Sequence, residues 1–218
     1  MKEGIILIGG GQHCRVVLYN MMMQGKYSAK CVIDPDINKI GSTIDDCFVE
    51  GYEVFDVKYL HFIQQKYNTR KFFISLGSMK KRKKIFEFMI ENNWEPVNII
   101  HPNAVVSSSV KIGQGVLIEA GCLITPNPII GDNVVINTGS QVNHDNIVEN
   151  HTYIASGVLL SGGVTIKENT LIDDGVIVTL GKSVGKNCII GAGSVVTKDI
   201  PDNSIGYGSP CKVIRENT

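Results

Sequence analysis

An aliphatic residue returns at every sixth position in the second half of the chain, and this period limits the possible folds more than any other feature. The series runs from Ile112 to Val196 and covers fifteen consecutive hexads. Three residues after the aliphatic position, twelve of the fifteen hexads carry Gly or Asn, which adopt left-handed backbone dihedrals at little cost. A period of six excludes an amphipathic helix, and the strict repeat is typical of a solenoid.

Three hexads make one triangular coil of eighteen residues, so the pattern predicts a parallel β-helix over roughly residues 100–200. The aliphatic residues should point inward and stack on those eighteen positions away. Adjacent coils pair about 4.8 Å apart, so five or so coils would give a prism about 25 Å tall. The spacing alone does not give the handedness of the coil.

The first hundred residues predict a small parallel α/β sheet. An apolar strand at Gly4–Ile8 leads into Gly9-Gly10-Gly11, a helical pattern follows, and a second strand at Lys30–Ile33 precedes Asp34. In such a βαβ unit the glycine turn lets a ligand approach the backbone, and the helix N-terminus favours phosphate. Asp34 is placed to meet a ribose or sugar hydroxyl.

The dinucleotide fingerprint G-x-G-x-x-G is incomplete, because Gln12, His13 and Cys14 follow Gly11. Binding of part of a nucleotide or of a sugar is therefore favoured over binding of a complete NAD. A tight turn without a ligand is the alternative.

The rest of this region predicts a helix over 56–68, a strand at Lys71–Leu76 and a turn at Gly77-Ser78. The basic run Lys80–Lys84 opens a further helix and reads most simply as a solvated face, with a phosphate contact by one lysine as the alternative. Val97–Ile100 reads as a fourth strand. These patterns predict a Rossmann-like domain over residues 1–98 and a β-helix domain over residues 99–218.

Composition excludes several classes of protein. The 21 basic and 21 acidic residues cancel, so no affinity for nucleic acid or for a membrane surface is indicated. The opening MKEGIILIGGG does not read as a signal peptide, and no apolar run is long enough to span a bilayer. Six scattered cysteines without a C-x-x-C pair indicate reduced thiols in a cytoplasmic protein.

Three hexads have neither Gly nor Asn at the turn position, and they carry Asp145, His151 and Asp199 instead. The pair His144-Asp145 in mid-solenoid therefore predicts a functional site. An imidazole accepts and returns a proton near neutral pH, and an adjacent carboxylate holds its tautomer. Gly162, eighteen residues after His144, and its neighbour Gly163 should lie one coil above it, with backbone N–H groups open to a thioester oxyanion. The alternative is that His144 is an exposed turn residue.

A zinc site is not expected. His151 lies seven residues beyond His144, one to two corners round the prism, so the two rings should not meet within a chain. With His101 at the start of the coil, the three histidines lack a spacing suited to zinc.

Several segments together resemble the bacterial sugar acetyltransferases of the NeuD/PglD type over essentially the whole chain. They are IILIGGGQHCRVV, VIDPD, SLGSMKKRKKI, IIHPNAVV, INTGSQVNHDNIVENHTYIASGVLLSGGVTI and IGAGSVVTKDIPDNSIGYGSPCKVIRE. The resemblance implies a Rossmann-like domain joined to a left-handed β-helix.

The resemblance also implies functional residues. His144 matches the general base of the family, and Asp145 matches its acidic neighbour. Acetyl-CoA would lie along a prism edge between two subunits of a homotrimer, and the matching positions on that edge are Tyr153, Gly162, Asp174 and Ala192. Tyr153 departs from the histidine often found there. The nucleotide sugar would be held by Gly11, Gln12, His13, Asp34 and Gly77, with Gln12 in place of a common glycine.

The expected function is transfer of an acetyl group from acetyl-CoA to the amine of a UDP-linked 4-amino sugar, without a metal. O-acetylation of sialic acid by the same base is one alternative. A non-catalytic trimeric binding scaffold and a zinc-dependent carbon dioxide hydratase are others.

Overall fold

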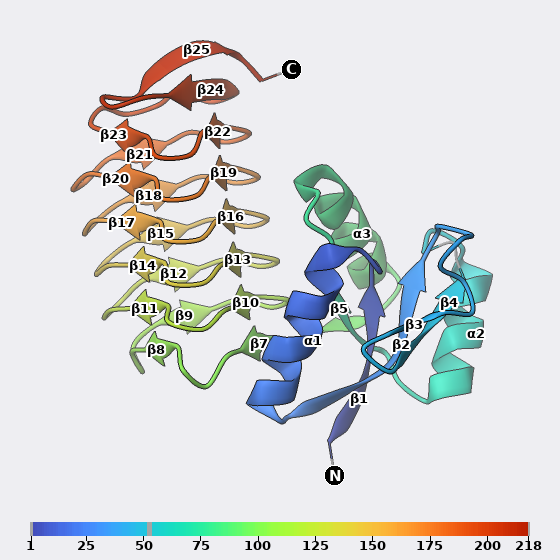
Figure 1. The fold of residues 1–218 in the computed structure, drawn as a ribbon. Helices are drawn as coiled ribbons and strands as arrows, with labels where there is room; N and C mark the ends of the chain where they lie inside the picture. The colour runs from blue at the N-terminus through green and yellow to red at the C-terminus, as the bar shows by residue number, and fades with distance from the viewer. Residues whose placement is uncertain (1, 52–53, 218) are drawn as a thin grey trace. The chain divides into compact units, whose positions relative to one another are not determined.

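The computed structural model describes residues 2–51 and 54–217. The chain divides into two compact units, Met1–Ile99 and Ile100–Thr218 (Figure 1). The N-terminal unit contains the α/β sheet, and the C-terminal unit contains the coil.

The N-terminal unit is built on a sheet with the strand order β3-β4-β2-β1-β5-β6. Its strands pair in parallel, except for the antiparallel hairpin of β3 and β4. The strands are β1 (Glu3–Ile8), β2 (Tyr27–Asp34), β3 (Thr43–Ile44), β4 (Cys47–Gly51), β5 (Lys71–Ile74) and β6 (Glu95–Pro96). The helices are α1 (Gln12–Gln24), α2 (Val57–Tyr67) and α3 (Met79–Glu91).

Local sequence explains where these helices begin and end. The Asp56 carboxylate caps α2 by accepting from the Lys58 N–H at 2.8 Å. Gly25 and Asn68 end α1 and α2 in the left-handed conformation, which Gly and Asn tolerate.

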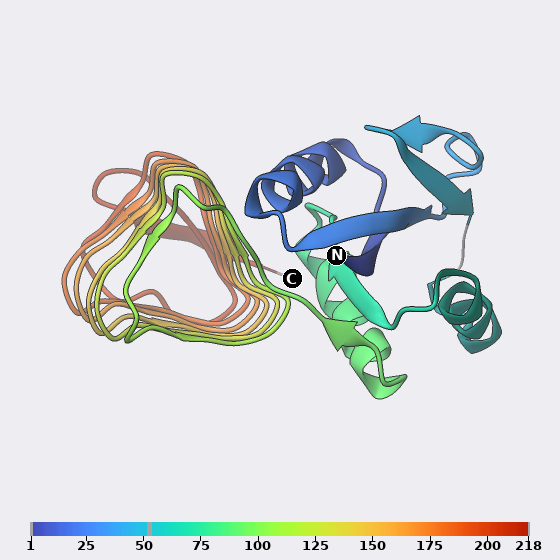
Figure 2. The same cartoon turned by 90° about the horizontal axis from the view of Figure 1, so that it is seen from below.

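The strand order reverses beside β1, and this reversal makes a binding crevice. The chain passes from β1 to β2 on one side and later returns to β5 on the other. Right-handed crossovers then put α1 on one face of the sheet and α2 and α3 on the opposite face, as Figure 2 shows. The carboxyl ends of β1 and β5 diverge at this switch point, where open α/β sheets bind their ligands.

Two features of the N-terminal unit differ from the sequence-based expectation. The hairpin of β3 and β4 was not predicted, because its two-residue turn uses Asp45 and Asp46 at φ of 45° and 65° instead of a glycine pair. The predicted strand Val97–Ile100 is wrong. Glu95–Pro96 joins the N-terminal sheet, whereas Ile99–Ile100 (β7) belongs to the coil. One apolar run crosses the domain boundary, so periodicity could not divide it.

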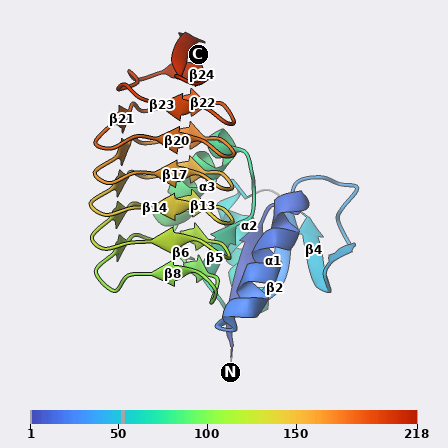
Figure 3. The ribbon, with the colours of Figure 1, turned by 60° about the vertical axis from the view of Figure 1, so that its left-hand side comes forward.

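The C-terminal unit is the parallel β-helix that the hexads predict, with the left-handed coil that the resemblance implies. Figure 2 shows its triangular section, and Figure 3 shows the coils stacked on one another. Strands pair with those eighteen residues away, for example Val135 with Tyr153. Apart from Ile112 in the first coil, the anchors from Ile118 to Val196 are at most 2% exposed. Each such side chain contributes about 1.5–3 kcal/mol of hydrophobic stabilisation.

Each coil contributes one two-residue strand to each of three faces. The first face holds β7 (Ile99–Ile100), β10 (Leu117–Ile118), β13 (Val135–Ile136), β16 (Tyr153–Ile154), β19 (Leu171–Ile172) and β22 (Ile189–Ile190). The second holds β8 (Val105–Val106), β11 (Leu123–Ile124), β14 (Gln141–Val142), β17 (Leu159–Leu160), β20 (Ile177–Val178) and β23 (Val195–Val196). The third holds β9 (Lys111–Ile112), β12 (Ile129–Ile130), β15 (Ile147–Val148), β18 (Thr165–Ile166) and β21 (Ser183–Val184). The hairpin β24 (Ser204–Tyr207) and β25 (Lys212–Glu216) ends the first face.

The corners between faces use the left-handed backbone conformation that the Gly and Asn pattern predicts. Asp145 and His151 also adopt it, both at φ 61°, although it strains residues other than Gly and Asn. Asp199 has no positive φ. Its carboxylate instead accepts a hydrogen bond from the Ser183 N–H at 2.9 Å. The coil geometry changes there because the regular hexads end.

Each of the six cysteines, all among the described residues, is a free thiol. Burial raises the pKa of Cys31 to about 12 and that of Cys122 to about 11, so these thiols stay protonated at neutral pH. In the described part of the chain, no helix has the length and apolar character needed to cross a membrane.

Candidate active site and nucleotide pocket

His144 and Asp145 occupy the corner between β14 and β15, on the prism edge that joins the second and third faces. We call this the His144 edge. Nδ1 of His144 lies 2.9 Å from Oδ2 of Asp145, and both side chains are 61% exposed. The hydrogen bond from His144, followed by one from the Asn127 amide at 3.2 Å, lowers the pKa of Asp145.

This geometry assigns different roles to the two ring nitrogens. With Asp145 ionised, Nδ1 carries the proton and donates a hydrogen bond to the carboxylate. Nε2 therefore keeps its lone pair and can accept a proton. The corner thus presents a base whose tautomer and ring orientation are held by its sequence neighbour.

Gly162 lies one coil above His144, where the eighteen-residue period puts it. A Cβ at this position would come 2.4 Å from Nε2 and 2.5 Å from Cε1 of His144. Any larger residue would therefore displace the ring. Glycine at 162 leaves the space that the imidazole occupies.

The backbone N–H groups above the ring differ in availability. The Gly163 N–H donates to the His144 carbonyl at 2.9 Å, so the expectation that it is open to a ligand is wrong. At equivalent corners the preceding N–H donates to the side chain eighteen residues on, as from Gln114 to Asp132 and from Ser156 to Asp174. Residue 180 is Leu. Among the described residues, no acceptor is found for the Gly162 N–H.

The positions matched to acetyl-CoA lie on two edges and one face of a single chain, so one chain alone does not bring them together. Gly162 is on the His144 edge. Asp174 and Ala192 are on the edge that joins the first and second faces, here called the Asp174 edge, and Tyr153 is on the first face. Asp174 and Ala192 follow Gly162 by 12 and 30 residues, which in a coil of three corners corresponds to a different edge.

The Asp174 edge and the neighbouring first face have polar contacts of their own. Asp174 accepts from the Ser156 N–H at 2.9 Å, Ala192 is exposed, and the Tyr153 hydroxyl accepts from the Asn137 amide at 3.1 Å. His151 lies on the remaining edge, 3.0 Å from the Asn133 amide.

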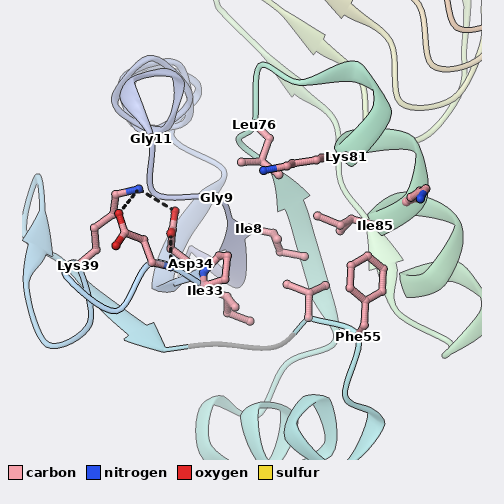
Figure 4. Close-up of a pocket in the computed structure, with 14 residues that line it drawn as sticks. Ile8, Gly9, Gly11, Ile33, Asp34, Lys39, Phe55, Leu76, Lys81 and Ile85 are labelled. Atoms are coloured by element: carbon pink, nitrogen blue, oxygen red, sulfur yellow. Dashed lines mark hydrogen bonds and ion pairs between the residues drawn. The ribbon is translucent and has the colours of Figure 1, made fainter. Parts of the chain in front are cut away.

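The N-terminal unit has a cavity of about 680 Å³ at the switch point of its sheet (Figure 4). Of the positions matched to the nucleotide sugar, Gly11 and Asp34 line it, whereas Gln12, His13 and Gly77 do not. Figure 4 shows Asp34 and Lys39 on one wall and Leu76, Lys81 and Phe55 on the other. The complete lining is Ile8, Gly9, Gly11, Ile33, Asp34, Pro35, Asp36, Lys39, Val54, Phe55, Leu76, Lys81, Lys84 and Ile85.

Asp34 holds the glycine turn in place. Its carboxylate is buried and accepts from the Gly10 N–H at 2.6 Å and from the Asp36 N–H at 2.9 Å. The Lys39 ammonium lies 3.3 Å away. These contacts occupy most of its lone pairs, which leaves little capacity for a ligand hydroxyl.

Sequence reasoning missed Lys39 and Phe55 as cavity residues, and no motif marks either of them. Lys81 and Lys84 were noticed only as part of a basic run. Their spacing of three residues puts them on one helix face, but nothing in the run shows which face meets the cavity.

His13 lies at the start of α1 and is partly buried. Burial, and then the nearby Arg82 guanidinium, lower the pKa of His13 to about 4. The ring is therefore neutral at pH 7 and brings no positive charge to the turn.

Across residues 2–51 and 54–217, no cluster of three or more His, Cys, Asp or Glu side chains is arranged to hold a metal ion.

Comparison with known proteins finds a family that matches the N-terminal unit and solved structures that match the whole chain. The family model of the PglD N-terminal domain matches residues 4–89. GDP-perosamine N-acetyltransferase of Escherichia coli is 27% identical over 121 residues, which are 56% of this chain. The match covers 53% of that enzyme, so the chain spans about half the length of this curated relative.

Two solved structures resemble the whole chain. Perosamine N-acetyltransferase of Caulobacter crescentus, a histidine-to-asparagine mutant in complex with CoA and GDP-perosamine, is 30% identical. The match covers 98% of this chain and 97% of that one, with a TM-score of 0.89. The acetyltransferase domain of PglB from Neisseria gonorrhoeae, with acetyl coenzyme A, is 27% identical over 98% of this chain and 100% of that one, with a TM-score of 0.86.

Proposed function

Because the chain belongs to the sugar acetyltransferases of the NeuD/PglD type, we propose that it transfers the acetyl group of acetyl-CoA to the amine of a nucleotide-linked amino sugar. The observation that carries this proposal is the His144 corner. Asp145 holds Nδ1 of the ring, and Nε2 faces Gly162 with its lone pair available.

The residues of this corner support each part of the reaction. The sugar amine attacks the thioester carbonyl, and Nε2 of His144 takes the proton that the amine loses as the N–C bond forms. Asp145 stabilises the imidazolium. The Gly162 N–H, which finds no acceptor in the described part of the chain, is suited to the oxyanion. When the C–S bond breaks, His144 returns the proton to the CoA thiolate.

A homotrimer would complete this site. Outward residues of the second face form an apolar ladder in which Val105 is 64% exposed and Leu123 and Ile177 are each 37% exposed. Such a surface is suited to burial against copies of the chain. If three second faces surround a threefold axis, the His144 edge of one subunit meets the Asp174 edge of the next.

Acetyl-CoA would bind in this groove between subunits. Gly162 of one chain and Asp174 and Ala192 of its neighbour would then contact the same molecule, which explains why one chain carries these positions on two edges. Tyr153 would contribute from the first face. We place the reaction in the cytoplasm, because the free cysteines suit a reducing compartment.

The nucleotide sugar would occupy the cavity of the N-terminal unit. Its volume of about 680 Å³ is within the range of small-molecule sites. Gly11 and Asp34 line this cavity, and Gln12, His13 and Gly77 flank the same strand ends. The resemblance of the sequence favours UDP as the nucleotide, whereas two of the three relatives named above act on or bind GDP-perosamine, so GDP is the second candidate.

Thioester consumption with a panel of acceptors tests the proposal. With UDP- or GDP-linked 4-amino sugars as acceptors, the enzyme should release CoA thiol from acetyl-CoA and form an acetamido sugar that mass spectrometry detects. With sialic acid it should do neither. His144→Ala should lower kcat/KM at least about a hundredfold without loss of folding, since general bases contribute about 10²–10⁴. If none of the amino sugars caused release of CoA, the proposed acceptor would be refuted. If His144→Ala lowered kcat/KM by less than tenfold, the assignment of His144 as the base would be refuted.

A further inference from the structure

The basic run Lys80–Lys84 separates into residues with different surroundings once it is folded into α3. Arg82 turns inward and is only 3% exposed. Its Nη1 donates to the Ile74 carbonyl at 2.6 Å and lies 3.4 Å from the Leu76 carbonyl. It therefore braces the end of β5 instead of facing solvent.

Lys81 and Lys84 line the cavity of the N-terminal unit, and Figure 4 shows Lys81 opposite Asp34. They are three residues apart, so one face of the helix carries both. Lys83 lies elsewhere on the helix and pairs with Glu87 at 3.9 Å. Lys80 is exposed and is not part of the cavity lining.

The charges in the cavity are unevenly compensated. Lys39 lies 3.3 Å from Asp34 and 3.6 Å from Asp36, so two carboxylates balance it. Within residues 2–51 and 54–217, no carboxylate comes within ion-pair distance of Lys81 or Lys84. Two ammonium groups that line the cavity without a neighbouring carboxylate favour the binding of an anion there.

The glycine turn on the opposite wall offers an anion fewer backbone donors than its sequence suggests. The Gly9 N–H donates to the Ile33 carbonyl at 2.8 Å, and the Gly10 N–H donates to the Asp34 carboxylate at 2.6 Å. In a complete dinucleotide fingerprint the backbone of this turn approaches the pyrophosphate. Here these two donors are used within the protein, so cationic side chains would add to what the N-terminus of α1, which begins at Gln12, offers an anionic ligand.

We propose that Lys81 and Lys84 form the diphosphate subsite of this cavity and give the enzyme its preference for a nucleotide-linked sugar. The inference rests on the proposed function for the identity of the ligand. The subsite recognises the charge of the diphosphate, which UDP and GDP share.

A pair of matched double variants tests this assignment. Lys81→Met with Lys84→Met removes the two cavity charges, and Lys80→Met with Lys83→Met removes two charges from the same helix outside the cavity. The cavity variant should raise the KM for the nucleotide sugar about a hundredfold, because each charged hydrogen bond to an anion contributes about tenfold or more. The KM for acetyl-CoA should be unchanged, and the control variant should resemble the parent.

Binding of UDP and GDP by calorimetry gives a readout that does not need turnover. The cavity variant should lose affinity for both nucleotides about a hundredfold, while the control keeps it. Equal losses in the two variants would mean that net charge alone acts, and an unchanged cavity variant would mean that the lysines do not meet the diphosphate. Either result overturns the subsite. Binding of both nucleotides without any acetyl transfer would instead refute the proposed function.

Discussion

Replacing Gly162 by Ala should disable the His144 base without harming the fold. The added Cβ would lie 2.4 Å from Nε2, whereas ordinary contacts to a Cβ begin at 3.4 Å. The imidazole must therefore move by about 1 Å, a displacement that costs about a hundredfold in rate when it misaligns a catalytic group. The backbone of Gly162 is not left-handed, so Ala fits it and should change stability by less than about 1 kcal/mol.

The assay combines kcat/KM, thermal unfolding and a double-mutant cycle. Gly162→Ala should lower kcat/KM about a hundredfold and leave the melting temperature unchanged or slightly raised. In a His144→Ala background it should have no further effect, because the ring that it displaces is absent. Gly162→Ala retains its N–H, so loss of an oxyanion donor cannot explain the result. Near-parental activity, or an additive loss in the double variant, would refute the steric reasoning.

Three further predictions concern stability and assembly. His13 has its pKa lowered from 6.5 to about 4 in the folded chain, so the unfolded state binds more protons between these values and stability falls as the pH drops through them. Because of His13, the free energy of unfolding should fall by about 2 kcal/mol between pH 7 and pH 5, and His13→Gln should abolish this part of the fall. Urea titration at both pH values measures it, and the same fall in the variant as in the parent would contradict the buried neutral ring. Ile154→Ala in the coil interior should cost about 2–5 kcal/mol, whereas Ile147→Ala on the outer side of the third face, where the side chain is 39% exposed, should cost much less, and similar losses would mean that the inward register is wrong. Leu123→Glu on the second face should yield monomers by light scattering and abolish acetyl transfer, with Thr165→Glu on the outer side of the third face as the charge control; an active monomer would refute the intersubunit groove.

The parts of the structure that repeat were predictable from sequence. Each inward residue has the same chemical neighbours as its counterparts eighteen positions away, so the period alone specifies the coil and its corners. The exception at His144-Asp145 could be noticed because the surrounding rule is strict. The placement of Gly162 above His144 followed from the same arithmetic.

The parts that do not repeat were less predictable. Whether Lys81 or Lys83 faces the cavity depends on how α3 rotates to bury Arg82, which no local pattern specifies. The hairpin of β3 and β4 has strands too short for a periodic signal. The resemblance gave the acetyl-CoA positions only as places along the chain. The prism edge of each position depends on where it falls within an eighteen-residue coil, so the resemblance did not show that Gly162 lies on a different edge from Asp174 and Ala192.

The eighteen-residue register also limits how this protein can vary. Because each strand such as Leu159–Leu160 pairs with Gln141–Val142 below and Ile177–Val178 above, one extra residue within it would turn every later anchor outward. Insertions can be absorbed only as loops at the corners or as whole added turns. If the proposed sites are right, new acceptor preferences would arise more readily by remodelling the separate N-terminal unit, while the edge proposed to bind acetyl-CoA stays nearly constant in length.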